Sequence, residues 1–148
     1  MNKISRVVVP VDFLANADKL VDYSSYLAKQ LSAVIHFVHV VSGPAGDAMI
    51  GAPFAAEYEG KMLTDAQTRM ANLLEDYGDS CPNCTGEVVL GDPVDKIVDI
   101  ARNKDADLII ISTHGAKGME KILLGSVAER VLKRAHCPVL IMNPFKNK

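Results

Sequence analysis

Short apolar runs alternate along the chain with longer segments in which apolar residues recur every three or four positions. The runs are rich in Val and Ile and carry few charges, which is typical of strands buried on both faces of a parallel sheet. They occupy residues 6–12, 33–41, 87–90, 107–112 and 138–142. We predict a strand in each run and place the most apolar one, 107–112, near the centre of the sheet.

The segments between these runs have helical periodicity. Apolar residues recur at helical spacing over 17–31, 56–77, 93–101 and 126–135. Asp92 suits the start of the third of these helices, because Asp caps a helix, and a Pro at the first helical position follows it. A helix between two strands supplies the crossover that parallel pairing requires. The pattern therefore predicts a single-domain, doubly wound α/β fold with a five-stranded parallel sheet and four helices.

Composition and charge narrow the class of protein. The 148 residues are 49% hydrophobic but only 5% aromatic, without Trp, which fits one aliphatic core better than a base-stacking surface. Lys and Arg number 16 against 18 for Asp and Glu, so we expect no general binding to nucleic acid. The first residues lack a secretory signal and no apolar run could cross a bilayer. We therefore expect a cytoplasmic protein that does not bind membranes.

Candidate binding residues lie where the strands are predicted to end. In a doubly wound sheet, ligands bind beyond the carboxyl ends of the strands. Asp12, Val40 and residues 112–115 follow or end three strands. Gly125 and Ser126 open the last helix, where N–H groups and the helix dipole favour an anion. Plainer alternatives are a cap or solvated turn for Asp12, a core position for Val40, and a simple turn and N-cap at the last helix.

The spacing of two glycines connects these residues to a known family. Gly115 and Gly125 flank nine residues, and this spacing, with the serine that follows, resembles the nucleotide-binding signature of universal stress proteins, G-x2-G-x9-G-[S/T]. The likeness extends over 125–131, 136–140 and 9–12, and in element order over essentially the whole chain. The resemblance implies a Rossmann-like fold of the adenine nucleotide alpha-hydrolase type.

The resemblance also implies an adenine-nucleotide site. ATP is the expected ligand, with AMP and ADP as alternatives and Mg²⁺ as a further candidate. The matching positions are Pro10, Val11 and Asp12 beside adenine and ribose, Val40 beside the base, and Ile111, Ser112, Gly115, Gly125, Ser126 and Val127 around the ribose and phosphates. The first glycine of the signature is replaced by Ser112. Its side chain could crowd a phosphate or donate a hydrogen bond to one.

These features lead to three functional hypotheses. The first is a nucleotide-binding, homodimeric stress-response regulator in which ATP occupancy changes residues 42–60. The second is a nucleotide-free dimeric interaction protein of the same fold, and the third is a redox protein that uses Cys81 and Cys84. Hydrolase, P-loop and dinucleotide motifs do not occur in the sequence, and no general base or catalytic metal cluster is evident. We expect at most slow ATP hydrolysis.

The last strand is expected to form an edge of the sheet and a dimer interface. Val139, Leu140, Ile141 and Met142 carry no charge, and an apolar edge strand can pair with another chain. Antiparallel pairing about a two-fold axis would satisfy both edges, and the resemblance to universal stress proteins implies this arrangement. The alternative is an edge covered by the tail at 143–148.

Cysteine and histidine residues give weaker signals. Cys81 and Cys84 form a CxxC between the second helix and third strand, and we expect an unlinked surface pair. A reversible disulfide and a metal shared between subunits are the alternatives. Cys137 precedes a strand, so we expect it in the core. His36 and His39 should point to opposite faces of a strand and hold no common metal.

Overall fold

Five strands and four helices alternate in the computed structural model, which describes residues 3–43, 54–113 and 124–145. The elements are β1 (Arg6–Pro10), α1 (Ala17–Leu31), β2 (Val34–Val41), α2 (Ala55–Asp76), β3 (Thr85–Leu90), α3 (Pro93–Asn103), β4 (Leu108–Ser112), α4 (Ser126–Arg134) and β5 (Val139–Met142). The predicted order is confirmed. The bounds differ by at most two residues: β1 ends two residues before Asp12, β3 begins two residues before Glu87, and α3 ends two residues after Ala101.

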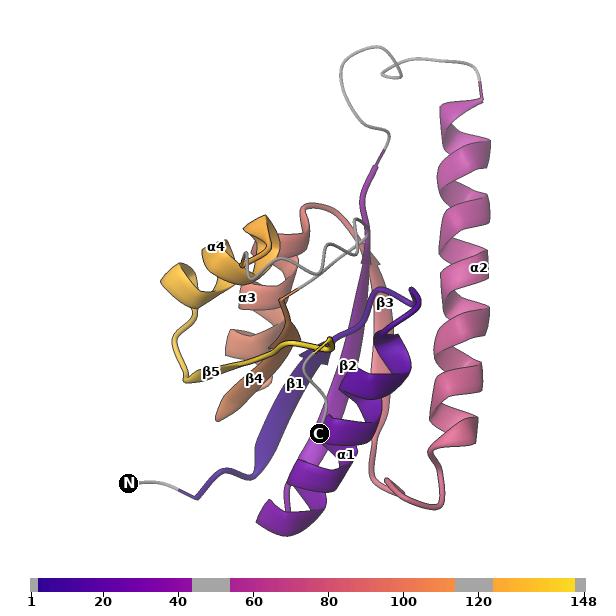
Figure 1. Cartoon of the computed structure of the whole chain (residues 1–148). Coiled ribbons are helices and arrows are strands. Elements are labelled where there is room, and N and C mark those ends of the chain that lie inside the picture. Colours follow the sequence, from indigo (N-terminus) through magenta and orange to yellow (C-terminus); the bar gives the residue numbers. More distant parts are fainter. Residues whose placement is uncertain (1–2, 44–53, 114–123, 146–148) are drawn as a thin grey trace.

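All five strands are parallel and lie in the order β3-β2-β1-β4-β5 (Figure 1). From β1 the chain adds β2 and then β3 on one side, and α3 carries it back to place β4 on the other side of β1. Such a reversal defines a doubly wound sheet, and the switch point lies between β1 and β4. The predicted fold class is confirmed, with β4 next to the central strand and β5 at an edge.

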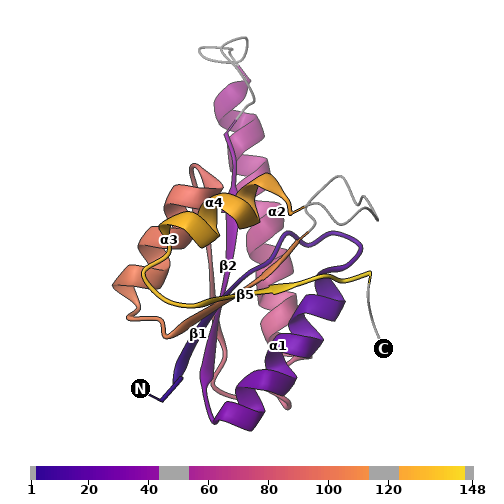
Figure 2. The ribbon, with the colours of Figure 1, turned by 60° about the vertical axis from the view of Figure 1, so that its left-hand side comes forward.

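Two apolar clusters cover the two faces of the sheet. Alternate residues of β1 divide between them: Val7 and Val9 join Leu20 of α1 and Met70 of α2, whereas Val8 joins residues of α3 and α4. Figure 2 shows the corresponding arrangement, with α3 and α4 on one side of the sheet and α1 on the other. The alternation follows from the pleat of a strand. It explains why the strand sequences read as continuous apolar runs.

Two aspartate side chains accept backbone hydrogen bonds where an element begins or ends. The Asp92 carboxylate accepts a hydrogen bond from the backbone N–H of Asp95 at 3.0 Å, so Asp92 caps α3 as expected, with Pro93 at its first turn. At β1, the Asp12 carboxylate accepts the N–H of Leu14 at 2.9 Å. This turn begins where the ladder of β1 stops, which explains why the strand is shorter than its apolar run.

One carboxylate fastens the start of β1 to the start of β4. Oδ2 of Asp107 accepts the N–H of Ser5 at 2.8 Å, the hydroxyl of Ser5 at 2.9 Å and the N–H of Arg6 at 2.9 Å. The N–H and hydroxyl of Ser5, and then the N–H of Arg6, lower the pKa of Asp107. The ionised carboxylate therefore contributes to stability.

We expect Asp107→Asn to lower the melting temperature by a few degrees at neutral pH, because an amide accepts these hydrogen bonds more weakly. Folding lowers the pKa of Asp107, so its contribution is present above the pKa of the unfolded chain and is lost as pH falls through the folded value. The difference between wild type and variant should thus shrink in acid, measured by urea unfolding. Asp105→Asn is the matched control, since Asp105 has only an exposed ion pair with Arg6 at 3.7 Å. A pH-independent difference would contradict this assignment.

Candidate functional site

The two strands at the switch point stay paired only near their amino ends. β1 pairs with β4 at Val7–Leu108 and Val8–Ile109. Beyond these pairs each strand keeps only its other neighbour: β1 pairs with β2 as far as Pro10, and β4 pairs with β5 as far as Ser112. The carboxyl ends of β1 and β4 are therefore not paired with each other, which is typical of a switch point where a ligand binds.

The end of β1 presents an exposed carboxylate on a fixed turn. Pro10 is half-buried, Val11 is buried in the first apolar cluster, and Asp12 is exposed. The hydrogen bond from Leu14 N–H confirms the solvated-turn interpretation of Asp12. It also fixes the direction of the carboxylate, which can still accept hydrogen bonds from hydroxyl groups. Phe13 follows with φ 58°, a left-handed conformation that non-glycine residues seldom adopt.

A histidine that the sequence did not single out as a site residue supports this turn. Nδ1 of His39 lies 2.6 Å from the carbonyl oxygen of Val11, and its ring packs on Phe13 with a centroid separation of 4.8 Å. Because a carbonyl only accepts, Nδ1 carries the proton, which leaves Nε2 as an acceptor in the neutral ring. His36 has different partners, Thr85 and Glu87, each at 2.7 Å. The two histidines therefore have separate hydrogen-bond partners.

The end of β4 combines a buried aliphatic residue with two hydroxyl side chains. Ile111 is buried in the second apolar cluster, and Ser112 is half-buried and in register with Met142 of β5. Thr113 extends the hydrogen bonding to β5 by one residue, since its N–H donates to the Met142 carbonyl at 2.9 Å. Oγ1 of Thr113 is buried and lacks a hydrogen-bond partner in the described part of the chain. Such an unsatisfied atom is unusual, and sequence reasoning overlooked it.

The start of α4 comes back against the end of β4 at Gly125. Its N–H donates to the Thr113 carbonyl at 2.9 Å, and its own carbonyl accepts the N–H of Glu129 at 2.9 Å. A Cβ at Gly125 would lie 2.6 Å from the Thr113 carbonyl oxygen. Glycine is thus needed at position 125 for this close approach of the two backbone segments.

The N-terminus of α4 has no side-chain cap within residues 3–43, 54–113 and 124–145. Gly125 is the N-cap residue and has no side chain to accept from the first N–H groups. Ser126 is exposed, while Val127 is half-buried against the second apolar cluster. Unsatisfied N–H groups and the positive end of the helix dipole favour a negative group here.

The structure thus brings most predicted site residues to one end of the sheet. Ile111, Ser112, Gly125, Ser126 and Val127 lie at the end of β4 and the start of α4, and Pro10, Val11 and Asp12 lie at the end of the adjacent β1. Val40 lies on β2, half-buried, and packs against the second apolar cluster. Gly115 lies outside the described residues, as do 44–53 of the segment expected to respond to ATP.

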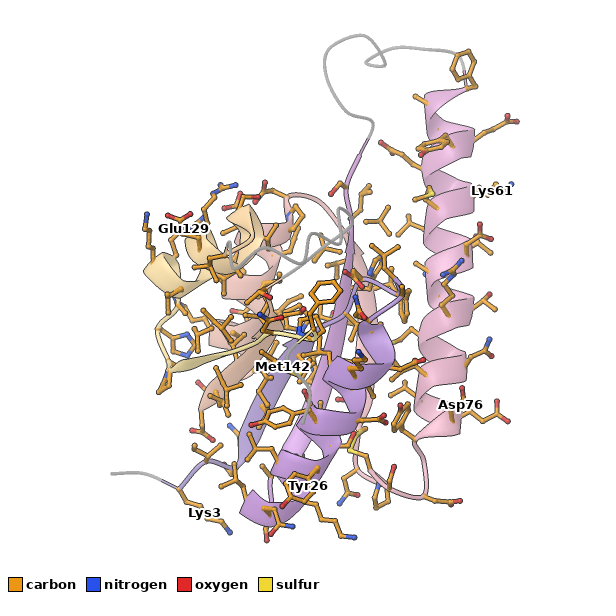
Figure 3. All side chains as sticks on the ribbon, viewed as in Figure 1. Lys3, Tyr26, Lys61, Asp76, Glu129 and Met142 are labelled. Carbon is orange, nitrogen blue, oxygen red and sulfur yellow. A yellow bond between two sulfur atoms is a disulfide. The ribbon has the colours of Figure 1, made fainter. Side chains whose placement is uncertain are left out.

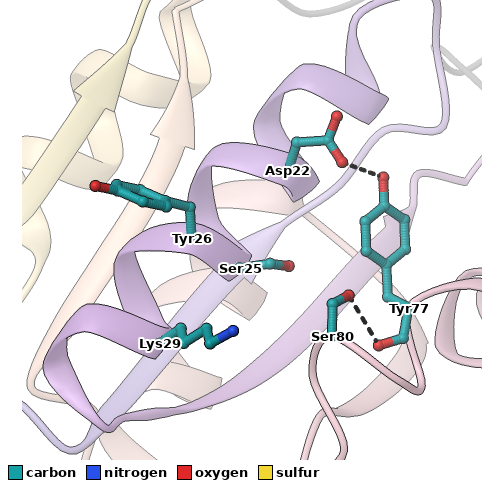
Figure 4. Close-up of a pocket in the computed structure, with 6 residues that line it drawn as sticks. All are labelled: Asp22, Ser25, Tyr26, Lys29, Tyr77 and Ser80. Carbon is teal, nitrogen blue, oxygen red and sulfur yellow. Dashed lines mark hydrogen bonds between the residues drawn. The ribbon is translucent and has the colours of Figure 1, made fainter.

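Two cavities lie elsewhere. The first, of about 230 Å³, lies between α1 and the chain after α2 and is lined by Asp22, Ser25, Tyr26, Lys29, Tyr77 and Ser80 (Figure 4). The second, of about 200 Å³, lies at the amino ends of β1 and β2 and includes His36. Neither is lined by a predicted site residue. Within 3–43, 54–113 and 124–145 no group of three metal-binding side chains occurs, and no helix could span a membrane.

Comparison with known proteins shows the family of the chain. The model of the universal stress protein family matches residues 3–143, so the chain belongs to that family. Universal stress protein MJ0531 of Methanocaldococcus jannaschii is 32% identical over 99% of this chain and 86% of its own length. The structure of protein MJ0577 superposes with a TM-score of 0.84 at 26% identity and covers 99% of this chain and all of its own.

A further structure bears on the ligand. The universal stress protein from Archaeoglobus fulgidus in complex with dAMP is 26% identical to this chain and superposes with a TM-score of 0.57. The superposition covers 95% of this chain and 98% of that protein. An adenine nucleotide is thus bound by a relative of the same fold and similar length.

We expect Gly125→Ala to destabilise the protein by about 1–3 kcal/mol, because the added methyl group would push against the Thr113 carbonyl. Urea unfolding measures the effect. Gly60→Ala is the matched control: Gly60 lies inside α2, and a Cβ there would meet no atom within 4 Å. This control should stabilise the protein by about 0.5–1 kcal/mol. Equal effects of the two changes would show that the contact between 113 and 125 imposes no constraint.

Proposed function

We propose that this protein binds an adenine nucleotide at the carboxyl ends of β1 and β4. The observation that carries the proposal is the N-terminus of α4, which has no capping side chain in the described part of the chain and lies against the end of β4, a strand that borders the switch point. An anion-binding helix start in this position suits a phosphate. The dAMP complex of the Archaeoglobus relative supports the same class of ligand.

In this proposal the two strand ends have different tasks. Asp12 accepts hydrogen bonds from the ribose hydroxyls, while Pro10, Val11 and Val40 border the adenine and ribose. Gly125, Ser126 and the N–H groups that follow receive the phosphates, and the unsatisfied Oγ1 of Thr113 gains a partner in the bound state. We propose ATP as the physiological ligand, with Mg²⁺ bound through its phosphates.

The consequence of binding is regulatory rather than catalytic. We propose a stress-response regulator of the cytoplasm in which nucleotide occupancy changes the protein's interactions. The described residues of the site include one carboxylate, Asp12, and it already accepts a hydrogen bond from Leu14. That arrangement suits ribose recognition better than activation of water.

The proposal predicts that Asp12→Asn weakens AMP and ATP binding by about tenfold, or ~1.4 kcal/mol. Asn keeps an oxygen that can accept the N–H of Leu14, so the turn is preserved while the charged acceptor is lost. Titration calorimetry of the full chain measures the affinity, and Asp22→Asn, on α1 beside the other cavity, is the control. Gly125→Val should also weaken nucleotide binding at least about tenfold, because its side chain would push against the Thr113 carbonyl and displace the start of α4. Wild-type affinity in a folded Asp12→Asn protein would place the ribose elsewhere.

Ser112 favours a second candidate function, a dimeric interaction protein that binds no nucleotide. Ser112→Gly separates the two. If the hydroxymethyl group blocks the site, this change should create binding that wild type lacks. We expect less than about a tenfold change in ATP affinity, because the side chain is only half-buried and its hydroxyl can donate to a phosphate. A gain from undetectable to measurable binding would support the nucleotide-free alternative.

We further propose a homodimer made by antiparallel pairing of β5. The carbonyls of Pro138 and Met142 accept from Ile109 on β4 and from Thr113 just after it, so the alternate residues Val139 and Ile141 present their backbone groups to the outer edge. No second strand neighbours β5 in the described part of the chain. The tail does not run along this edge at Pro144, which is buried and accepts from Nζ of Lys19 on α1 at 3.1 Å.

Two changes test this interface. Leu140→Lys should shift the protein toward monomer, although Leu140 also packs on the first apolar cluster and the variant should be less stable. Ile141→Pro separates these effects, because it removes an outward N–H and leaves the ladder to β4 intact. Both should give monomers in sedimentation velocity at micromolar concentration. A monomeric wild type, or a dimeric Ile141→Pro protein as tight as wild type, contradicts pairing through β5.

A further inference from the structure

The turn between α2 and β3 joins Cys81 to Cys84 in a disulfide. This corrects the expectation of an unlinked surface pair. The N–H of Cys84 donates to the carbonyl of Cys81 at 3.0 Å, and Pro82 and Asn83 occupy the two central positions of this turn. Pro suits the first central position because its φ is fixed. The turn sets the Cα atoms of the cysteines 5.4 Å apart, within the usual range for a disulfide.

This turn does not depend on the sulfur–sulfur bond alone. The N–H of Cys81 donates to the Tyr77 carbonyl at 2.8 Å, and Ser80 Oγ donates to the same carbonyl at 3.3 Å. The hydroxyl of Tyr77 donates to the Asp22 carboxylate on α1 at 2.7 Å (Figure 4). Burial, and then the Asp22 carboxylate, raise the pKa of Tyr77 and keep its proton in place. The backbone around the cysteines therefore has its own anchors and can persist when the bond is broken.

The disulfide lies at the boundary between solvent and core. Cys81 and Cys84 are half-buried and pack against the first apolar cluster, whereas Pro82 and Asn83 between them are exposed. The turn follows Asp76, the last residue of α2, which is labelled in Figure 3. The two cysteines are thus partly exposed and lie outside any helix or strand, so a small thiol can reach this turn from solvent.

The third cysteine belongs to a different part of the molecule. Cys137 packs against the second apolar cluster, on the opposite face of the sheet from Cys81 and Cys84. Burial raises the pKa of Cys137 and lowers its thiolate fraction. Only Cys81 and Cys84 are therefore placed to form a pair within one chain.

We propose that Cys81 and Cys84 are a reversible thiol–disulfide couple that exchanges electrons with low-molecular-weight thiols and their disulfides. In reduction, a thiolate of the small thiol attacks one sulfur, forms a mixed disulfide and releases the other cysteine as a thiolate, which takes up a proton. A second small thiol attacks the mixed disulfide and frees the remaining cysteine. Two electrons pass to the protein, and the two small thiols leave as one disulfide. Oxidation is the reverse.

The couple also bears on the neighbouring cavity. Tyr77 and Ser80 line the cavity of about 230 Å³, and both anchor the turn through the Tyr77 carbonyl. A closed disulfide restricts the backbone of the turn, and an open one gives it more freedom. The redox state of the pair thus sets how tightly the chain after α2 is fixed to α1 through the Tyr77–Asp22 hydrogen bond.

The full chain, free of nucleotide, is equilibrated in buffers of varying reduced-to-oxidised glutathione ratio and quenched with acid. Its free thiols are then alkylated under denaturing conditions, and mass spectrometry counts the adducts on each chain. Of the three cysteines, only Cys137 lies outside the disulfide, so the oxidised protein should carry one adduct and the reduced protein three. The conversion between one and three adducts should be reversible, and no species with two adducts should accumulate. The Cys137→Ser protein should still differ by two adducts between its oxidised and reduced forms. The Cys84→Ser protein should instead form a mixed disulfide between Cys81 and glutathione. Three adducts at every ratio, or a disulfide that includes Cys137, would overturn the proposal.

Hydrogen exchange of the same samples tests the link to the fold. Amides of residues 77–85 should exchange about tenfold faster in the reduced protein, since the turn opens locally more often. Amides of α3, at 93–103, serve as the internal control and should not change. Equal exchange of 77–85 in both redox states would show that the disulfide has no influence on the anchoring of α2. Neither readout depends on the proposed nucleotide site.

Discussion

The reversal of winding direction at β1 is the constraint on which the rest of the structure depends. β1 has β2 on one side and β4 on the other, and the connections to these neighbours run on opposite faces of the sheet. Because a parallel crossover is right-handed, building the sheet outward in two directions requires this division of the helices. It also brings the ends of β1 and β4 together without a helix between them. The order in which the strands are connected therefore determines where the candidate site lies, and the side chains determine what it can bind.

Periodicity made the architecture predictable. Continuous apolar runs identified strands buried on both faces, and the alternation with helices required parallel pairing and placed Asp12 and Ser112 at the same end of the sheet. The capping of α3 was readable as well, since Asp92 and Pro93 act on their own neighbours in sequence. Strand ends were less predictable. β1 stops at Pro10, a residue that has no N–H for a further ladder bond, and β3 starts at Thr85, which is in register with His36 of β2.

Interactions between residues far apart in the chain could not be read from the sequence. The contact of His39 with the Val11 carbonyl and the three hydrogen bonds of Asp107 involve atoms that only the folded sheet brings together. The CxxC segment illustrates a different limit. Its position away from a helix N-terminus argued against an activated thiol. The turn formed by Pro82 and Asn83 nevertheless supplies the geometry for a disulfide, and that signal was present in the sequence.

The hydrogen bond from Gly125 to the Thr113 carbonyl has a consequence for how such a protein can diversify. It joins the end of β4 directly to the start of α4 through backbone groups alone. The entropy of closing a connection between two fixed points grows only slowly with its length. Insertions, deletions or exchanged sequences between these two residues can therefore be accommodated without displacing the sheet or the helix. Gly125 thereby keeps the start of α4 against the end of β4 when the connecting sequence changes in length.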